Sequence, residues 1–396
     1  MATGYRPEWV QGVFVDFIES RLHPFWSLSM PKIRLLARHR LSDDLIALQF
    51  ETNRAFRQQA LRTQKDWQGG QYLNVSVALA GIFHQRSYSL VGLAEQPLWW
   101  MDDSIKTKTS ENPLRHTVTV AIKPQGLVSD YLTKRMPLGT ALQSSVPTGS
   151  FTLAQAALVQ ESLAKEHSQS ASLLFIASGS GITPMLGLIT EALYNGHQVT
   201  LLHYNRTILL QSQWQTLAAT YPDFTYHLID TEDSKTYLAG TRYLTANSLL
   251  TLDLSWAETQ IFACGSQALL TSLYSAADQI PLPNGKSLRD NIIIESFGTS
   301  FVDATDEQTL DKAPTQTVYL RARQRQFSSN ATLLTAAEKA GIRLTHGCRQ
   351  GICQLCRCHK ISGVVKNIQT GKLSHDGNEF IQTCINVAVT DVVLDV

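Results

Sequence analysis

The sequence predicts a multidomain protein: an antiparallel β-barrel, then a parallel α/β sheet, then a small α+β domain that carries most of the cysteines. Three observations support this prediction: short strand-like runs separated by turns in residues 31–152, a continuous apolar run at 173–177, and five of the six cysteines within the last fifty residues. Strand-like runs between frequent turns are typical of antiparallel barrels, whereas a continuous apolar run indicates a strand buried on both faces. The expected boundaries are 1–30 (a helical extension), 31–152, 165–298, 299–314 (a linker) and 315–396.

The composition fits a globular chain and argues against several classes of protein. With 396 residues, 43% of them hydrophobic, and a net charge of +1, the chain is long enough for two to four domains. No apolar run approaches the ~20 residues that span a bilayer, and the N-terminus lacks a signal-peptide pattern. The basic residues are dispersed and no nucleic-acid-binding motif is present, so we expect no nucleic-acid partner. Because ligating thiols must stay reduced, we expect a cytoplasmic location.

The N-terminal 30 residues allow two interpretations. Val10, Phe14, Phe17 and Ile18 recur at roughly helical spacing, which predicts an amphipathic helix packed on its own protein. The apolar surface also fits a docking element for a membrane-bound partner, and hence a peripheral contact with a membrane. This stretch alone does not decide between them.

The barrel segment contains two motifs suited to a phosphorylated, planar cofactor. Strands are expected at 45–50, 72–77, 118–122 and 142–146. Arg86-Ser87-Tyr88-Ser89 would place an arginine fork and an aromatic ring on the same side of a strand, where they can hold a phosphate and stack on a heterocycle. Gly126-Leu127-Val128-Ser129 follows a strand and enters a helix that Ser129 would cap, so that its backbone N–H groups can bind an anion.

The α/β segment contains a second phosphate-type loop. The apolar strand at 173–177 runs into Gly179, Gly181, Thr183 and Pro184. The glycines allow close approach of a pyrophosphate, and Thr183 and Pro184 are expected as N-cap and first residue of a helix. Further candidates follow two later strands at 199–204 and 260–263, where ligands bind in open α/β sheets: Asn205, Arg206, Cys264 and Gly265. Cys264 taken alone also fits a small buried hydrophobe.

The cysteines of the last domain have the spacing of a plant-type 2Fe–2S site. Four residues separate Cys348 from Cys353, two separate Cys353 from Cys356, and twenty-seven separate Cys356 from Cys384. A zinc site is the alternative, but zinc ribbons usually need two close cysteine pairs. Cys358 is an additional cysteine that we expect to face away from the ligands.

In this order, the motifs R-S-Y-S, G-L-V-S, G-S-G-I-T-P, C-G and E-S-F resemble those of the ferredoxin–NADP⁺ reductase superfamily, and the C-terminal domain resembles a plant-type, β-grasp ferredoxin. The combination is similar to phthalate dioxygenase reductases and to the reductases of membrane fatty-acyl desaturases. Two positions depart from the pattern: Ser266 stands where proline is common, and Gln354 where a small residue is usual.

The resemblance implies a role for each matching residue. In the barrel, Arg86 to Ser89 and the backbone of Gly126 to Ser129 would bind FAD, with Tyr88 against the isoalloxazine and Ser89 near its N5. Gly179, Gly181, Thr183 and Pro184 would hold the nicotinamide nucleotide. The residues implied near the reacting rings are Tyr88, Ser89, Cys264, Gly265, Glu295 and Phe297.

The implied activity is electron transfer from a nicotinamide nucleotide through FAD and a 2Fe–2S cluster to a terminal oxygenase. NADPH is expected over NADH because Arg206, with Arg242, could pair with a 2′-phosphate, although NADH stays possible. The resemblance of the N-terminal segment favours a membrane fatty-acyl-CoA desaturase as acceptor. A soluble Rieske-type oxygenase or a hybrid-cluster protein is the alternative, and a zinc-binding interaction module is the alternative of a different class.

Overall fold

The structure is a computed structural model. It describes residues 16, 18, 21–63, 67–79, 82–94, 96–98, 116–155, 172–285, 287–296, 315–346, 351, 355–368 and 373–396. The chain divides into two compact units, Met1–Glu295 and Ser296–Val396. The first unit contains two sheets and the second contains the C-terminal cysteines. Among the described residues, no helix is long and apolar enough to cross a membrane.

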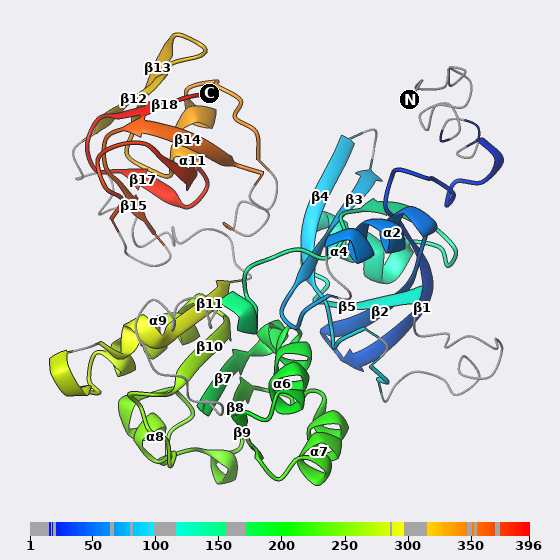
Figure 1. Cartoon of the computed structure of the whole chain (residues 1–396), viewed down its shortest axis with the longest axis vertical. Helices are drawn as coiled ribbons and strands as arrows, with labels where there is room; N and C mark the ends of the chain where they lie inside the picture. The colour runs from blue at the N-terminus through cyan, green and yellow to red at the C-terminus, as the bar shows by residue number, and fades with distance from the viewer. Residues whose placement is uncertain are drawn as a thin grey trace, which may run out of the picture. The chain divides into compact units, whose positions relative to one another are not determined.

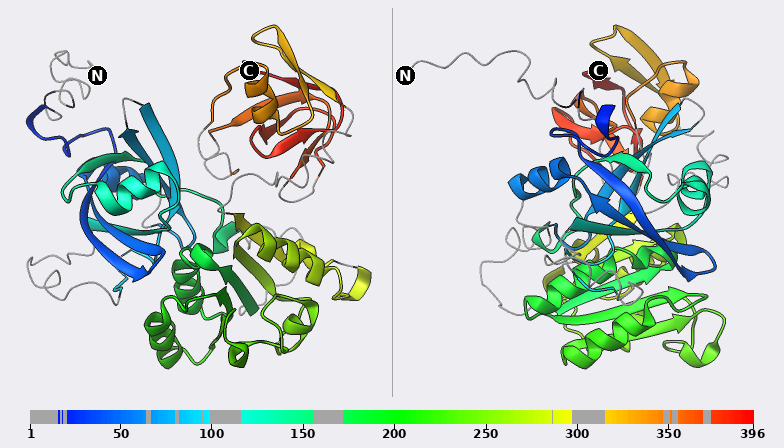
Figure 2. Two further views of the ribbon diagram at one scale, coloured as in Figure 1. Left: turned by 180° about the vertical axis from the view of Figure 1, so that it is seen from behind. Right: turned by 90° about the vertical axis from the view of Figure 1, so that its right-hand side faces the viewer.

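The first sheet is an antiparallel barrel of six strands in the order β4-β3-β6-β1-β2-β5. A bridge between Leu90, at the end of β4, and Val120 of β5 joins the two edges. Figure 2 shows the strongly curled sheet in two further views. The strands are β1 (Lys32–Ser42), β2 (Leu45–Thr52), β3 (Tyr72–Leu79), β4 (Ile82–Ser89), β5 (Thr117–Ile122) and β6 (Ala141–Ser144).

Short helices accompany the barrel. Helix α2 (Arg54–Thr63) follows β2, and α4 (Leu127–Asp130) follows β5 and continues into a π-helical turn, Tyr131–Arg135. Val128 and Leu132 are buried in the same apolar cluster as the inward side chains of β1, β2, β3 and β5. The loop that carries the G-L-V-S motif is therefore fixed on the barrel by its own apolar residues.

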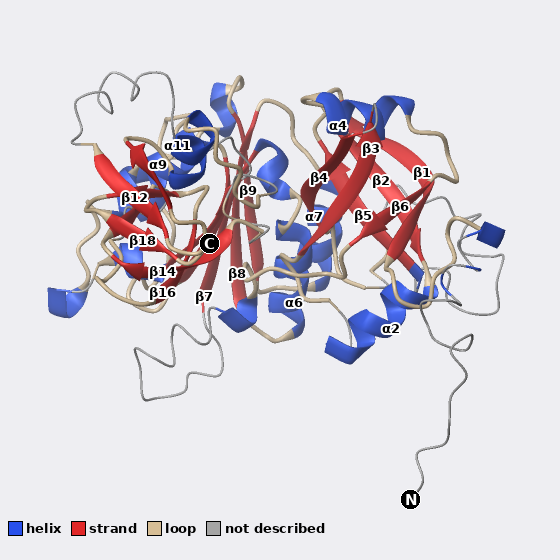
Figure 3. Ribbon diagram, turned by 90° about the horizontal axis from the view of Figure 1, so that it is seen from above, coloured by secondary structure: helices blue, strands red, loops and turns tan. Residues whose placement is uncertain are grey.

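The second sheet of this unit has the order β11-β10-β7-β8-β9. Strands β7, β8, β9 and β10 are parallel, as the continuous apolar run of β7 predicts. Figure 1 shows α6 and α7 on one face and α8 and α9 on the other, and Figure 3 shows the strands between these layers. The elements are β7 (Ser172–Ser178), α6 (Met185–Tyr194), β8 (Gln198–Asn205), α7 (Gln211–Thr220), β9 (Phe224–Asp230), α8 (Ala246–Leu250), β10 (Gln260–Gly265), α9 (Gln267–Ala277) and β11 (Ile292–Ser296).

The strand order places a topological switch point between β7 and β10. From β7 the chain proceeds to β8 and β9 on one side, and then returns to β10 on the other side of β7. The loops that leave the carboxyl ends of β7 and β10 therefore diverge, and the crevice between them is the usual ligand site of such sheets. The loop at Gly179 to Thr183 and Cys264 both lie at this point.

The second unit contains a mixed sheet in the order β13-β12-β18-β14-β16 and a two-stranded sheet, β15-β17. Thr332 caps α11 through its side chain, which accepts a hydrogen bond from the N–H of Thr335, and Gly341 follows the helix with φ +69°. The elements are β12 (Gln316–Leu320), β13 (Arg325–Ser329), α11 (Leu333–Lys339), β14 (Arg357–Ser362), β15 (Val365–Asn367), β16 (Glu379–Gln382), β17 (Asn386–Ala388) and β18 (Val392–Leu394).

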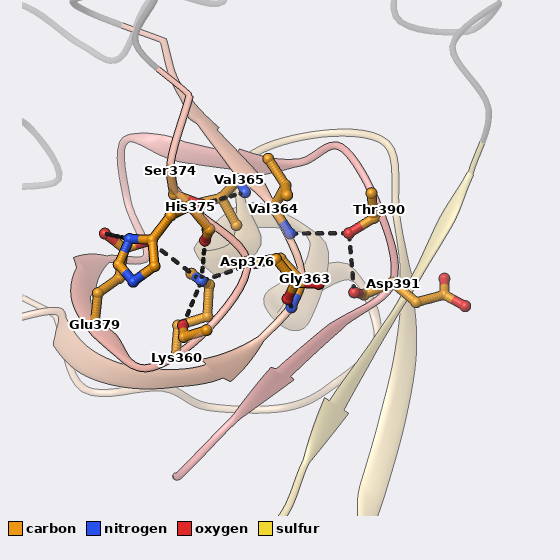
Figure 4. Close-up of polar contacts among 11 residues, drawn as sticks. Lys360, Gly363, Val364, Val365, Ser374, His375, Asp376, Glu379, Thr390 and Asp391 are labelled. Carbon is orange, nitrogen blue, oxygen red and sulfur yellow. Dashed lines mark hydrogen bonds and ion pairs between the residues drawn. The ribbon is translucent and has the colours of Figure 1, made fainter.

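A fully buried lysine holds two loops of this unit together. The Lys360 ammonium donates to the carbonyl oxygens of Gly363 (2.8 Å), His375 (2.9 Å) and Gly377 (2.8 Å) and lies 3.2 Å from the Glu379 carboxylate. Figure 4 shows these contacts converging on the lysine. In the sequence, Arg349, Arg357, His359 and Lys360 flank the cysteine loop, which predicts a basic rim around it. For Lys360 this prediction is wrong, because its side chain is 0% exposed.

For the N-terminal segment, the described residues show both kinds of surface. The Phe25 ring is 7% exposed and so packs on the protein, whereas Trp26 is 51% exposed. The Arg34 guanidinium lies over the Phe25 ring, 4.7 Å from its centroid. Val10, Phe14 and Phe17 lie outside the described residues, so both interpretations of this segment stay predictions.

Candidate functional site

The R-S-Y-S motif occupies the end of β4. Alternation along the strand places Arg86 and Tyr88 on one side, as expected, while the Ser87 hydroxyl donates to Asn74 Oδ1 (2.7 Å) on β3. Burial raises the pKa of the Tyr88 phenol, and the positive charge of Arg86 opposes this shift. Both side chains therefore lie on one face of β4, where they could contact the same cofactor.

Ser89, Glu295 and Cys264 come together from three different strands. The Ser89 hydroxyl donates to Glu295 Oε2 (3.2 Å) although the two residues are 206 positions apart in the sequence. Burial and the nearby Glu295 carboxylate raise the pKa of the Cys264 thiol well above its ordinary value. Thus the last residue of β4, the end of β10 and β11 meet at the switch point, which joins the barrel motif to the parallel sheet.

Glu295 is a buried carboxyl group with an altered acidity. Burial raises its pKa to about 8, and the hydrogen bond from Ser89 opposes the shift. A carboxyl group whose pKa is higher in the folded than in the unfolded chain binds more protons when folded. Between the two pKa values the unfolded chain has released the proton that the folded chain still holds, and the free energy of unfolding falls as the pH rises. Stability is therefore lost as the pH rises from about 4.5 to about 8.

We expect Glu295→Gln to remove the loss of stability that the ionisation of Glu295 causes as the pH rises. The variant should gain free energy of unfolding relative to the wild type as pH rises, by up to ~1.4 kcal/mol per pH unit between those pKa values. All seven tryptophans precede residue 296, so urea unfolding followed by tryptophan fluorescence reports the first unit. Glu258→Gln, at an exposed position, is the control. A constant difference between wild type and Glu295→Gln across this range would contradict the assignment.

The G-L-V-S loop has the expected position but a different cap. Gly126 has φ +93° and ψ 173° at the N-cap of α4, and a methyl group added there would meet nothing within 4 Å. Ser129 does not cap the helix: its hydroxyl donates to the carbonyl oxygens of Gln125 (2.6 Å) and Gly126 (3.2 Å). The prediction of a serine cap was wrong because Ser129 lies inside the helical turn. The backbone N–H groups at the start of this turn remain without a side-chain cap.

The loop after β7 approaches the neighbouring strand closely. A methyl group on Gly181 would lie 2.1 Å from the Cys264 carbonyl oxygen, and Gly179 adopts φ +54°. The loop forms a 3-10 turn, Gly179–Ile182, so Thr183 is not the N-cap of α6; its hydroxyl donates to the Ser180 carbonyl oxygen (2.9 Å) and Pro184 holds the N-cap position. The helix therefore starts two residues later than Thr183.

The serine after Cys264-Gly265 has a structural explanation. Ser266 caps α9, where its hydroxyl accepts from the N–H of Leu269 (3.3 Å), and its own N–H donates to Ser178 Oγ (3.0 Å). A methyl group on Gly265 would lie 2.3 Å from Ser178 Oγ. Serine thus replaces proline without loss of the helix start, and it ties the ends of β7 and β10 together.

Asn205 and Arg206 follow β8 at the same edge of the sheet. The Asn205 amide donates to the Thr207 carbonyl oxygen (2.5 Å) and so shapes the turn. The Arg206 side chain is 82% exposed and lies 3.9 Å from the Glu232 carboxylate, a weak pairing at that exposure. Arg242 instead stacks on the Tyr243 ring, 4.9 Å from its centroid.

Sequence reasoning missed the seam between the two sheets of the first unit. The N–H of Gly69 donates to Glu191 Oε2 (2.7 Å), and the Gln96 amide donates to the Thr190 hydroxyl (2.9 Å). A methyl group on Gly69 would lie 2.4 Å from the Gly187 carbonyl carbon. Barrel loops thus rest on the backbone of α6, the helix that follows the Gly179–Thr183 loop. No local sequence motif marks these residues, because the contact pairs loops of one sheet with a helix of the other.

Two of the four predicted cluster ligands are described. Cys356 and Cys384 are buried, their sulfur atoms lie 3.1 Å apart, and the N–H of Gly351 donates to Cys384 Sγ (3.3 Å). An N–H directed at a thiolate sulfur is a feature of iron–sulfur sites. The described donors therefore fit a 2Fe–2S cluster. Cys348, Cys353, Gln354 and Phe297 lie outside the described residues.

Cys358 is buried in the same apolar cluster as the predicted ligands Cys356 and Cys384. It is 7% exposed and belongs to the apolar cluster of the second unit together with Val318 and Ile381. Burial and the neighbouring Cys356 raise the pKa of its thiol to about 12. The expectation that Cys358 is not a cluster ligand stays a prediction.

Comparison with known proteins identifies two domains. Residues 175–274 match the oxidoreductase NAD-binding domain, and residues 317–388 match the 2Fe–2S iron–sulfur cluster binding domain. The chain is 26% identical over 381 residues to an NADPH oxidoreductase of Mycobacterium tuberculosis, covering 94% of this chain and 86% of that protein. It is 23% identical over 350 residues to the glycine betaine monooxygenase reductase subunit of Chromohalobacter salexigens, covering 82% and 86% respectively.

The fold is also similar to that of an intact type IV self-sufficient cytochrome P450 monooxygenase, with a TM-score of 0.60 and 18% identity over 95% of this chain and 44% of that one. The predicted fold class is confirmed in all three parts. The chain is an NAD(P)H-dependent oxidoreductase in which an antiparallel FAD domain and a parallel NAD-binding domain precede a C-terminal 2Fe–2S domain.

Proposed function

We propose that this protein is the reductase component of an oxygenase and passes electrons from NADPH, through FAD and the 2Fe–2S cluster, to the oxygenase component. The observation that carries the proposal is the contact between Ser89 of the barrel and Glu295 of the parallel sheet. It brings the strand end that suits a flavin to the switch point that suits a nicotinamide nucleotide. A flavin supplies the exchange between a two-electron donor and a one-electron cluster.

In this proposal the barrel holds and orients FAD. Arg86, exposed on β4, binds the pyrophosphate, and the Tyr88 ring packs on the isoalloxazine. Ser87 fixes the strand through Asn74. The N–H groups of Gly126 to Ser129 bind phosphate at the start of α4. The space beside Gly126, where an added methyl group would meet nothing within 4 Å, leaves room for an anion.

The switch point holds the nicotinamide nucleotide. The loop that faces the pyrophosphate contains Gly179, Gly181, Thr183 and Pro184. Because the two glycines have no side chain, the backbone can approach the pyrophosphate closely. Cys264 and Gly265 lie beside the nicotinamide ring. Ser89 and Glu295 form a hydrogen bond between the two sheets, and Phe297 follows Glu295 by two residues in the sequence. In the last domain, the cluster is ligated by Cys348, Cys353, Cys356 and Cys384.

The acceptor is the finer part of this proposal. A relative is named as a monooxygenase reductase subunit, which supports an oxygenase as acceptor, such as a soluble Rieske-type oxygenase, over a fatty-acyl-CoA desaturase or a hybrid-cluster protein. The desaturase interpretation has no support beyond the resemblance of the N-terminal segment. The match of residues 317–388 to a 2Fe–2S domain favours iron over zinc on the cysteines.

A purified sample tests the cofactors and the electron path together. We expect a brown-yellow protein with visible absorption from flavin and cluster, two iron atoms per chain, and bleaching when NADPH is added without oxygen. Release of the flavin by heat followed by chromatography distinguishes FAD from FMN. A colourless protein that contains zinc would contradict the proposal. Turnover with candidate oxygenase components, and with membranes and an acyl-CoA, then identifies the acceptor.

Arg206 is the candidate for selecting NADPH. A charge-assisted bond to the 2′-phosphate is worth about 1.5–3 kcal/mol, so Arg206→Gln should raise KM for NADPH roughly tenfold or more and leave KM for NADH unchanged. Arg289→Gln, which removes an exposed arginine paired with Asp278, is the matched control. An equal rise for both nucleotides, or equal use of NADH by the wild type, would contradict this role.

A further inference from the structure

The outer face of β14 and β16 carries an exposed aromatic side chain between two basic ones. The strands are antiparallel, with Arg357 opposite Gln382 and His359 opposite Phe380. Alternation directs Cys358 and Lys360 into the core, where both are buried. Arg357, His359 and Phe380 therefore share the opposite face, and β16 is an edge strand of its sheet.

The Phe380 ring is 62% exposed yet held in place. The Arg357 guanidinium lies over the ring at 4.3 Å from its centroid, and the His359 ring lies 5.2 Å away on a tilted plane. A large aromatic side chain kept at the surface by a cation costs favourable burial unless a partner covers it. Aromatic and arginine side chains of this kind are the usual anchors of protein interfaces.

This face is continuous with the cluster site. Arg357 follows Cys356 directly, and Leu355, 38% exposed, precedes it. On β16, the Gln382 amide donates to the Gly351 carbonyl oxygen, while the N–H of Gly351 donates to Cys384 Sγ (3.3 Å). A protein that covers the face therefore lies against the segments that bear two of the cluster ligands.

We propose that Leu355, Arg357, His359 and Phe380, here called the β14–β16 patch, form the surface on which the electron acceptor docks. The inference rests on the proposed function, because it assigns the exit of electrons from the cluster. The partner is a redox protein that presents carboxylates around an apolar recess, with Phe380 filling the recess and Arg357 pairing with a carboxylate.

The charges around the patch support an acidic partner. Residues 315–396 contain ten lysines and arginines and five acidic residues, a difference of +5. The nearest carboxylate on β16, Glu379, is already paired with the buried Lys360, so it does not offset Arg357 at the surface. An acidic protein is therefore attracted to this domain and is oriented by the patch.

The test uses the holoprotein and the soluble haem domain of cytochrome b5, an acidic one-electron acceptor, as the probe. In Arg357→Gln and Phe380→Ser we expect the second-order rate of cytochrome b5 reduction by NADPH to fall roughly tenfold, and the dissociation constant between the two oxidised proteins, measured by surface plasmon resonance, to rise similarly. The wild-type rate should also fall as salt is added. The binding measurement needs no turnover.

Arg325→Gln is the matched control, because it removes an exposed arginine from β13, the opposite edge of the same sheet. It should stay within about twofold of the wild type, the variation usual for charges outside an interface. Unchanged binding and rate in both patch variants would overturn the inference. Arg357→Gln keeps the test valid if Phe380→Ser folds poorly.

One further measurement separates the possible failures. Stopped-flow bleaching of the protein by NADPH, without cytochrome b5, reports the internal steps and should be unaffected by the patch variants. Slower internal reduction of the cluster would overturn the inference, since the patch would then serve contact with the chain's own first unit. Absence of bleaching in the wild type would instead refute the proposed function.

Discussion

Cys384→Ala is expected to abolish electron delivery while leaving the first unit active. Cys384 is buried 3.1 Å from Cys356 and receives the N–H of Gly351, so its replacement by alanine removes one of the four proposed ligands. Because changes outside the ligand set already cost 10–100-fold in metal affinity, the loss of a ligand should lower NADPH-driven cytochrome reduction by about a hundredfold or more. Iron content and visible absorption should fall with it.

Ferricyanide reduction by NADPH reports the first unit and should stay near the wild-type rate. Cys358→Ala is the control, because this cysteine is buried in the same apolar cluster as Cys384 but lies outside the proposed ligand set. It should keep the iron and lose only about 1 kcal/mol of stability, as for small deletions in a core. If Cys358→Ala lost the cluster and Cys384→Ala kept it, the ligand assignment would be wrong.

Gly69→Ala is expected to slow the reduction of the protein by NADPH by roughly ten- to a hundredfold, since a displacement near 1 Å can cost that much when reacting groups must be aligned. The added methyl would lie 2.4 Å from backbone atoms of Gly187 and Leu188, whereas real contacts of this kind exceed 3.0 Å. The obstacle is backbone on both sides. The clash of the added methyl group can therefore be relieved only if the barrel loop and α6 move apart.

The expected signature is a change in rate rather than in affinity. KM for NADPH should change little, because the Gly179–Thr183 loop is untouched, while stopped-flow reduction slows. Gly139→Ala is the control: it also places alanine in the barrel, at φ +80°, but its methyl would meet nothing within 4 Å. An equal loss of reduction rate in both variants would indicate general instability. An unchanged rate in Gly69→Ala would show that the barrel loop and α6 can move apart without affecting the reaction, which would contradict the prediction.

The sequence predicted those parts of the fold that local chemistry determines. Continuous apolar runs gave the parallel strands β7, β8 and β10, and turn-bounded runs gave four barrel strands. Strand β1 was missed because its four basic residues break the apolar pattern; Arg34 pairs with Glu51 and Arg38 donates to the Leu132 carbonyl oxygen. Partners so distant in the sequence cannot be recognised from a short stretch of residues.

For the candidate site, the sequence located the motifs but not how they are joined. The loop at Gly179 and the cysteines Cys356 and Cys384 were found from spacing alone. Ser129 and Thr183 were expected as helix caps, because their residue types favour that role, but the turns around them are tighter than a simple helix start. Glu191 and Gly69 carried no signal, since their role exists only once two distant loops meet.

The buried Lys360 also makes the second unit a reporter of its own opening. Its amine is enclosed by three carbonyl oxygens and a carboxylate, so amine-directed reagents can reach it only when the loops around Gly363 and Gly377 come apart. The ratio of its labelling rate to that of exposed Lys366 measures the free energy of this local opening. Mass spectrometry of labelled peptides can thus follow how tightly the ferredoxin domain closes as its cluster is lost or rebuilt.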